Sequence, residues 1–182
     1  NFGKVENDGM ASRTFENAVA AYTAAAQKIG QFGDFFTDYA SYMKAWSEIE
    51  TAKRAHDNEE YAVAMQHYEK ASELLRESKS WTYLSLNFHA WSLLELAEDL
   101  SRKENSEESI EVFEKSTKSL QESKRILTIK LEGADKSDEK DLIKRLIEVS
   151  DTREEYSRGR SAIEQAKILD RQGDHPGSSE KY

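Results

Sequence analysis

Histidine and carboxylate side chains are the groups in this sequence that could carry out acid–base or metal chemistry. The chain holds four histidines and 35 acidic residues among 182. A di-iron site in a helical bundle needs Glu-x-x-His pairs, which place both ligands on one helix face. The residues three positions before the histidines are instead Lys53, Ala64, Leu86 and Gln172. His56 and Glu60 are one turn apart, and we interpret them as a surface histidine beside a helix end rather than as metal ligands.

Other catalytic patterns are missing from the sequence. There is no cysteine, so a disulfide, a thiolate metal site and a cysteine nucleophile are excluded. The chain contains no glycine-rich phosphate loop, no Gly-x-Ser-x-Gly elbow and no His-Glu-x-x-His motif. Carboxylate pairs such as Glu95 and Asp99 occur by chance in so acidic a chain and do not define a general acid. We predict a protein that is not an enzyme, with no catalytic residue, no metal and no cofactor.

The charge of the chain argues against nucleic acid as a partner. The formal net charge is −9, whereas phosphate backbones require a clustered basic face. Arg153, Arg158 and Arg160 form the densest basic cluster, but Glu154 and Glu155 interrupt it. We interpret this segment as a solvated helix face.

No segment of the sequence predicts membrane insertion. The most apolar stretch, Trp81–Leu94, is too short to span a bilayer and contains Asn87, His89 and Ser92. The first ten residues are polar and do not resemble a signal peptide. We therefore expect a soluble, cytoplasmic protein with no membrane partner.

Hydrophobic residues that recur every three or four positions predict an all-α fold. One proline and eight glycines leave little turn chemistry for β structure. Residues 1–12 lack this periodicity and are interpreted as a flexible tail or linker remnant. The predicted helices cover residues 13–30, 34–56, 59–78, 81–103, 106–131 and 139–172. The last of these is either one long helix or two helices bent near 150–160, because Gly159 costs only about 1 kcal/mol inside a helix.

Polar residues between these segments predict helix caps. Asp34 is placed to cap the second helix. Asp57 with Glu60, and Asn105 with Glu108, have the spacing of a capping box. Each pair is expected to separate one helix from the next.

The stretch Trp81–Leu100 is the most apolar part of the chain, and two copies of one pattern flank it. These copies are YEKASELLRESK from Tyr68 and FEKSTKSLQESK from Phe113, an offset of 45 residues (113 − 68). Tyr22 precedes Tyr68 by 46 residues, and Tyr182 follows Phe113 by 69. Each unit has a small residue, an aromatic residue four later and another small residue three after that. Small residues let a neighbouring helix approach closely, and the aromatic ring fills the space between successive hairpins.

The segments FENAVAAYTAA, EYAVAMQHYEKA and GDHPGSSEKY resemble the second helix of the tetratricopeptide repeat family. Trp46 and Ile49 match the Trp and Leu of its first helix, whereas Glu50 stands where the family has a small residue. The family repeats about every 34 residues, so the longer offsets here predict lengthened helices, as in the soluble NSF attachment proteins, which are an alternative likeness. The resemblance implies an α-solenoid of antiparallel hairpins over residues 13–182, with about six to seven helices. Because Tyr182 falls inside a second-helix motif, we expect the segment to be excised from a longer array, with a decayed terminal cap as the alternative.

The resemblance also implies a function, which is to bind a peptide or partner protein in a concave groove. The helices near 34–56, 81–103 and 139–172 would form this groove, and Asn87 and Ser92 would hydrogen-bond an extended peptide. The predicted partner-binding residues are Tyr42, Trp46, Asn87, Trp91 and Ser92, although the spacing of Tyr42 and Trp46 also fits core packing. Two alternatives remain: a small-molecule sensor with Tyr42, Trp46 and Trp91 around an apolar pocket, and self-association through the ends of the array.

Overall fold

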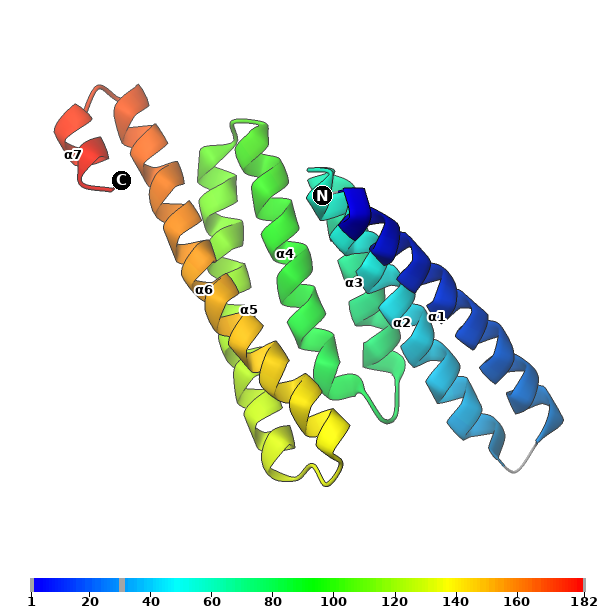
Figure 1. The fold of residues 1–182 in the computed structure, drawn as a ribbon. Coiled ribbons are helices and arrows are strands. Elements are labelled where there is room, and N and C mark those ends of the chain that lie inside the picture. Colours follow the sequence, from blue (N-terminus) through cyan, green and yellow to red (C-terminus); the bar gives the residue numbers. More distant parts are fainter. Residues whose placement is uncertain (1, 30–31, 182) are drawn as a thin grey trace. The chain divides into compact units, whose positions relative to one another are not determined.

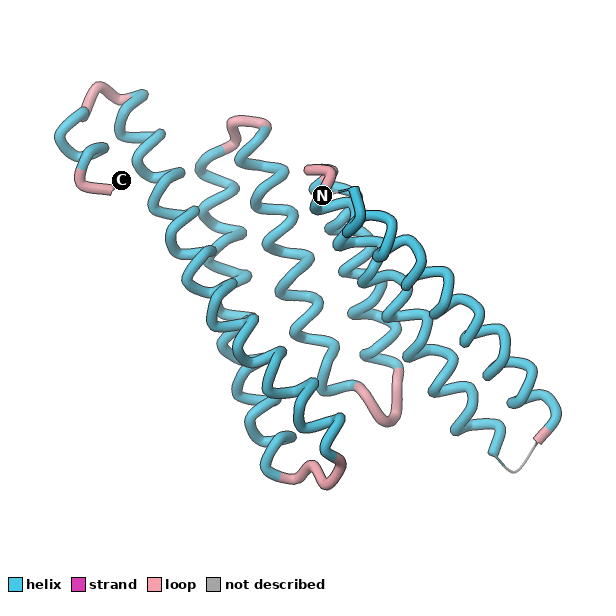
Figure 2. The backbone as a smooth tube through the Cα atoms, in the orientation of Figure 1, coloured by secondary structure: helices cyan, strands magenta, loops and turns pink. Residues whose placement is uncertain are grey.

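The computed structural model describes residues 2–29 and 32–181, with the side chains of residues 9–29, 32–175 and 177–181. These residues form helices joined by loops, without a strand among them (Figure 2). Seven α-helices and one short 3-10 helix, Thr82–Leu84, follow one another in the described part of the chain (Figure 1). The α-helices are α1 (Phe2–Lys28), α2 (Gly33–Asp57), α3 (Tyr61–Glu77), α4 (Ser85–Arg102), α5 (Ser106–Glu132), α6 (Ser137–Arg171) and α7 (His175–Ser179). The predicted all-α arrangement of helical hairpins is confirmed.

The chain divides into two compact units, residues 1–88 and 89–182, which we call the N-terminal and C-terminal units. In the N-terminal unit, α1 packs against α2 and α2 packs against α3. In the C-terminal unit, α5 packs against α6 and α6 packs against α7. The prediction of a single repeat domain over residues 13–182 stays a prediction.

The small–aromatic–small pattern marks the most deeply buried part of each unit. Tyr68 is 1% exposed in the N-terminal unit, and Phe113 is fully buried in the C-terminal unit. Ser109 and Ser116 flank Phe113, and their hydroxyls donate hydrogen bonds to carbonyl oxygens of α4, each at 2.8 Å. A serine at such a position lets two helices approach closely while its own polar group stays hydrogen-bonded. Tyr22 is only half-buried, and Tyr182 lies outside the described residues.

The repeat recurs in the backbone of three turns. Glu59, Glu104 and Gly173 have positive φ angles of 60°, 63° and 82°. They are 45 (104 − 59) and 69 (173 − 104) residues apart, the same offsets that separate the aromatic positions. In each turn the residue that follows donates its backbone N–H to the carbonyl oxygen five residues earlier. The donors are Glu60, Asn105 and Asp174, and the N–O distances are 2.9–3.0 Å. This is the Schellman ending of a helix, so α2, α4 and α6 end in the same way.

These turns explain why the predicted caps are wrong. Glu60 and Asn105 precede α3 and α5, but neither side chain makes a capping hydrogen bond. The chain reverses through backbone hydrogen bonds of the preceding helix end, and the predicted capping boxes do not form. Asp34 lies inside the first turn of α2, where its carboxylate pairs with Lys79 Nζ at 2.9 Å.

Helix ends also differ from the sequence expectation where tertiary contacts decide them. α1 begins at Phe2, so residues 2–12, expected as a flexible tail, are helical. Ser12 is buried there, and its hydroxyl lies 2.9 Å from that of Ser47 on α2. α4 begins at Ser85 rather than near residue 81, because the Asp38 carboxylate accepts hydrogen bonds from the N–H groups of residues 79 and 80, both at 3.0 Å.

The sequence left open whether residues 139–172 form one long helix or two, and α6 answers this question. It is one continuous helix of 35 residues, Ser137–Arg171. Gly159 lies in its interior and is exposed, and a Cβ added there would have no neighbouring atom within 4 Å. No crowding therefore requires glycine there, and the helix passes through it without a break.

Candidate functional site

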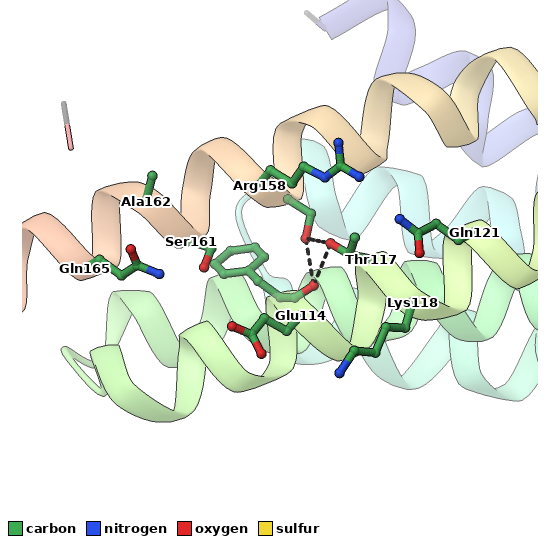
Figure 3. Close-up of a pocket in the computed structure, with 10 residues that line it drawn as sticks. Glu114, Thr117, Lys118, Gln121, Arg158, Ser161, Ala162 and Gln165 are labelled. Atoms are coloured by element: carbon green, nitrogen blue, oxygen red, sulfur yellow. Dashed lines mark hydrogen bonds between the residues drawn. The ribbon is translucent and has the colours of Figure 1, made fainter. Parts of the chain in front are cut away.

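A groove of about 450 Å³ lies between α5 and α6 in the C-terminal unit. Both helices contribute side chains along its length (Figure 3). α5 supplies Phe113, Glu114, Thr117, Lys118 and Gln121, and α6 supplies Ser157, Arg158, Ser161, Ala162 and Gln165. The lining thus combines apolar groups with amides, hydroxyls and charges of both signs.

Phe113 lies at the base of the groove, where the two helices touch. Its side chain is fully buried. Its carbonyl oxygen accepts hydrogen bonds from the hydroxyls of Ser157 at 2.8 Å and Thr117 at 3.0 Å, and these hydroxyls are 3.0 Å apart (Figure 3). Because Ser157 is small and fully buried, α6 approaches α5 closely at this point. The hydrogen bonds hold the two walls at one separation, so the groove is preformed.

The rim of the groove carries polar side chains whose hydrogen-bonding capacity is unused. Glu114, Lys118, Ser161 and Gln165 make no hydrogen bond or ion pair with any other residue in the described part of the chain. Two come from α5 and two from α6. A donor, an acceptor and two groups that can do both therefore line the groove between the two helices.

One end of the groove is closed by ionic contacts centred on Glu154. Its carboxylate, 6% exposed, accepts hydrogen bonds from Lys124 Nζ at 2.6 Å and Gln121 Nε2 at 2.8 Å, and it also pairs with Arg158. Burial raises the pKa of Glu154, but these donors outweigh burial and leave the pKa below its ordinary value. Hydrogen bonds to Asp151 and Glu154 raise the pKa of Lys124. The pair is ionised at neutral pH and joins α5 to α6.

A second buried carboxylate joins α6 to the end of α4 and the start of α5. Glu164 is fully buried and accepts hydrogen bonds from the hydroxyls of Ser101 at 2.6 Å and Ser106 at 2.8 Å, and from Lys167 Nζ at 2.6 Å. Burial raises its pKa, yet the donors lower it more, so the pKa of Glu164 lies below its ordinary value. A carboxylate so held stays charged and acts as a structural acceptor.

Glu98 on α4 completes this connection. It receives two hydrogen bonds from Arg160, both at 2.8 Å, and one from the Tyr156 hydroxyl at 2.7 Å. Bidentate contacts of this kind fix geometry as well as charge. Tyr156 and Arg160 therefore attach α6 to α4.

Two of the predicted partner-binding residues, Tyr42 and Trp46, lie together in the N-terminal unit. Their ring centroids are 6.1 Å apart in an edge-on contact. Tyr42 stacks on Trp81 at 4.2 Å, and Trp46 packs edge-on against Phe88 at 5.9 Å. Both predicted residues are half-buried, so they belong to an aromatic cluster within this unit.

The other three predicted residues are buried. Asn87 is fully buried, Trp91 is 6% exposed and Ser92 is 3% exposed. The guanidinium of Arg153 lies 3.7 Å from the ring centre of Trp91, and the Ser92 hydroxyl donates to the carbonyl of His89 at 2.7 Å. The structure places Tyr42, Trp46 and Asn87 in the N-terminal unit and Trp91 and Ser92 in the C-terminal unit. Their role in partner binding stays a prediction.

Sequence patterns contain little indication of the groove between α5 and α6. Arg158 belongs to a segment predicted to be a solvated face, and Lys118 and Gln165 belong to no functional motif. The available signal is the FEKSTKSLQESK segment, whose Phe113 and Thr117 line the groove. Which face of α6 meets that segment depends on helix pairing.

Metal clusters and membrane-spanning helices are not found among the described residues. In that part of the chain, no three or more histidine or carboxylate side chains gather where they could hold a metal ion. None of the helices described is both long and apolar enough to cross a membrane. No protein-family model matches the chain, and neither a curated protein nor a solved structure matches it significantly.

Proposed function

We propose that the chain is a non-catalytic protein-interaction module built from tetratricopeptide-like hairpins with lengthened helices. Three helix-ending turns at the offsets of the sequence repeat support this proposal, as do the buried small–aromatic–small positions around Tyr68 and Phe113. Stacked hairpins give rigid surfaces whose exposed side chains can vary without affecting the fold. A cytoplasmic location and the alternatives of small-molecule sensing and self-association stay predictions.

The site that we assign to partner binding is the groove between α5 and α6. The observation that carries this assignment is the set of four rim side chains, Glu114, Lys118, Ser161 and Gln165, that make no hydrogen bond or ion pair with another described residue. Protein interfaces combine an apolar centre with a polar rim that supplies about one hydrogen bond per 100–200 Å². The groove presents such polar side chains before any partner binds, beside the half-buried Ala162.

An extended peptide of a partner protein is the occupant that fits this groove. A peptide backbone presents alternating N–H and C=O groups, and the amide of Gln165 and the hydroxyl of Ser161 can serve both. Lys118 and Glu114 are four residues apart on α5 and offer opposite charges along one wall, which favours a peptide with an acidic and a basic side chain. The concave groove predicted over 34–56, 81–103 and 139–172 draws on both units and stays a separate prediction.

Selection of peptides from a random displayed library on the folded chain tests this assignment. We expect Lys118→Glu and Gln165→Ala to weaken a selected peptide at least about tenfold, because each removes a hydrogen-bonding group from the rim. Lys115→Glu is the matched control, since Lys115 is exposed on the same helix but does not line the groove. Equal weakening by Lys118→Glu and Lys115→Glu would show a general charge effect and remove the groove assignment.

A further inference from the structure

A second pocket, of about 380 Å³, lies in the N-terminal unit on the face where α1, α2 and α3 meet. Its lining is mainly polar and comes from residues 9–16 of α1, residues 47–54 of α2 and residues 67–70 of α3. Neither the sequence motifs nor the proposed peptide groove involves these residues. What distinguishes the pocket is the state of its cationic groups.

Two arginines at this pocket have no acidic partner among the side chains that the structure describes. Arg13 on α1 and Arg54 on α2 make no hydrogen bond or ion pair with any other described residue. Arg54 is half-buried, where a guanidinium without an acceptor is unfavourable. A Cβ built on Gly9 would lie 3.4 Å from Arg54 Nη1. The glycine therefore leaves the guanidinium room against the backbone of α1.

The nearest buried carboxylate does not neutralise these arginines, because it is already paired. Glu48 receives His67 Nδ1 at 2.6 Å and Lys70 Nζ at 2.5 Å. Burial raises the pKa of Glu48, but the contacts with Lys70 and His67 outweigh burial and leave the pKa below its ordinary value. Glu48 therefore remains an anion bound to its own partners. Of the pocket's charged residues, Arg13, Arg54 and Lys70 outnumber Glu16 and Glu48 even with His67 neutral. The pocket thus has an excess of positive charge, although the net charge of the whole chain is −9.

Three hydroxyl groups line the pocket beside the arginines. Ser12 and Ser47 are buried with their oxygens 2.9 Å apart, and Thr51 lies 3.3 Å from Ser12. Thr51 donates its proton to the carbonyl of Ser47 at 3.0 Å. The Ser12 hydroxyl also lies 3.4 Å from the Ser47 carbonyl oxygen, and the Ser47 hydroxyl can turn from Ser12 to donate its proton to a ligand that only accepts hydrogen bonds.

From this arrangement we propose that the pocket binds a phosphoryl group. A guanidinium fork matches phosphate oxygens in a bidentate manner, and two forks with a hydroxyl donor supply the number of donors that three phosphate oxygens require. A carboxylate has two oxygens and would leave part of this set unused. The phosphoryl group belongs either to a phosphorylated peptide side chain or to a free phosphate, which share this chemistry.

Titration of the full chain with inorganic phosphate at low salt tests the proposal. Backbone NMR shifts or calorimetry measure the binding. We expect saturable one-to-one binding that Arg54→Gln and Arg13→Gln each weaken at least about tenfold, because each removes a charge-assisted contact. Arg145→Gln is the control, since Arg145 is exposed on α6, makes no ion pair with another described residue and lies outside the pocket. Circular dichroism confirms that each variant is folded; neither pocket arginine makes a hydrogen bond or ion pair with another side chain in the described part of the chain.

The outcomes separate the possible ligands. Tighter binding of a phosphoserine peptide than of inorganic phosphate assigns the pocket to a phosphorylated chain, and the reverse order assigns it to a free phosphate. Acetate that competes as well as phosphate would overturn the phosphoryl assignment. Absence of saturable phosphate binding, or equal loss in Arg54→Gln and Arg145→Gln, would overturn the site itself.

Discussion

Two glycines near the end of the chain should respond in opposite directions to the same substitution. Gly159 lies inside α6 with open space around its Cβ position, whereas Gly173 ends that helix with a φ of +82°. In a helix interior, alanine is better than glycine by about 1 kcal/mol. We therefore expect Gly159→Ala to raise the free energy of unfolding by about that amount.

The opposite effect at Gly173 follows from its backbone conformation. An L-residue in the left-handed region costs about 1–2 kcal/mol. Part of this cost is offset because alanine has less freedom than glycine in the unfolded chain, an effect of about 0.4–1 kcal/mol. We expect Gly173→Ala to lower the free energy of unfolding by about 0.5–1 kcal/mol.

Urea denaturation followed by circular dichroism measures both changes, and a shift of about 1 kcal/mol corresponds to roughly 2–4 °C in thermal midpoint for a chain of this size. Gly133→Ala is the control, because Gly133 ends α5 at a φ of −94° that alanine adopts freely. Its effect should be only the gain of about 0.4–1 kcal/mol that comes from the reduced freedom of the unfolded chain. If Gly159→Ala and Gly173→Ala changed stability in the same direction, our account of α6 as one uninterrupted helix with a left-handed ending would be refuted.

Three further predictions concern the repeat turns, the helix contacts and the buried carboxylates. Glu104→Gly should be neutral or stabilising by up to about 1 kcal/mol, since φ is 63° there; Glu107→Gly, in the first turn of α5, should be destabilising in the same denaturation assay. Ser116→Val should cost about 1–3 kcal/mol because the fully buried hydroxyl contacts the carbonyl of Ala90, and Ser116→Ala should cost about 1 kcal/mol or less; equal losses would contradict close packing there. The folded-state pKa of Glu164 lies below its ordinary value of 4.5, so the unfolded chain binds the proton more tightly. The stability that Glu164 contributes is therefore present above about pH 4.5 and is lost as the pH falls toward the folded pKa; urea midpoints between pH 3 and 7 should show a weaker acid slope in Glu164→Gln, and an unchanged slope would contradict this role.

The helices were predictable because their apolar residues recur at helical spacing, and the burial of Tyr68 and Phe113 followed from their small neighbours. The helix ends were less predictable. The left-handed turns at Glu59 and Glu104 contain no glycine that would predict them from the sequence. The start of α4 depends on Asp38, which is distant in sequence. The role of Arg160 was equally ambiguous: its segment was interpreted as a solvated helix face, but Arg160 is the partner of Glu98.

The candidate sites depended on pairing that no local pattern contains. The groove requires that residues 113–121 of α5 face residues 157–165 of α6, and the proposed phosphoryl site brings together Arg13 and Arg54 from different helices. By itself, the sequence determined an acidic all-α chain with a repeated small–aromatic–small helix, because composition and periodicity act over a few helical turns. Only the tertiary structure decided which of the described polar side chains pair with one another and which do not, because that depends on the rotation and register of one helix against another.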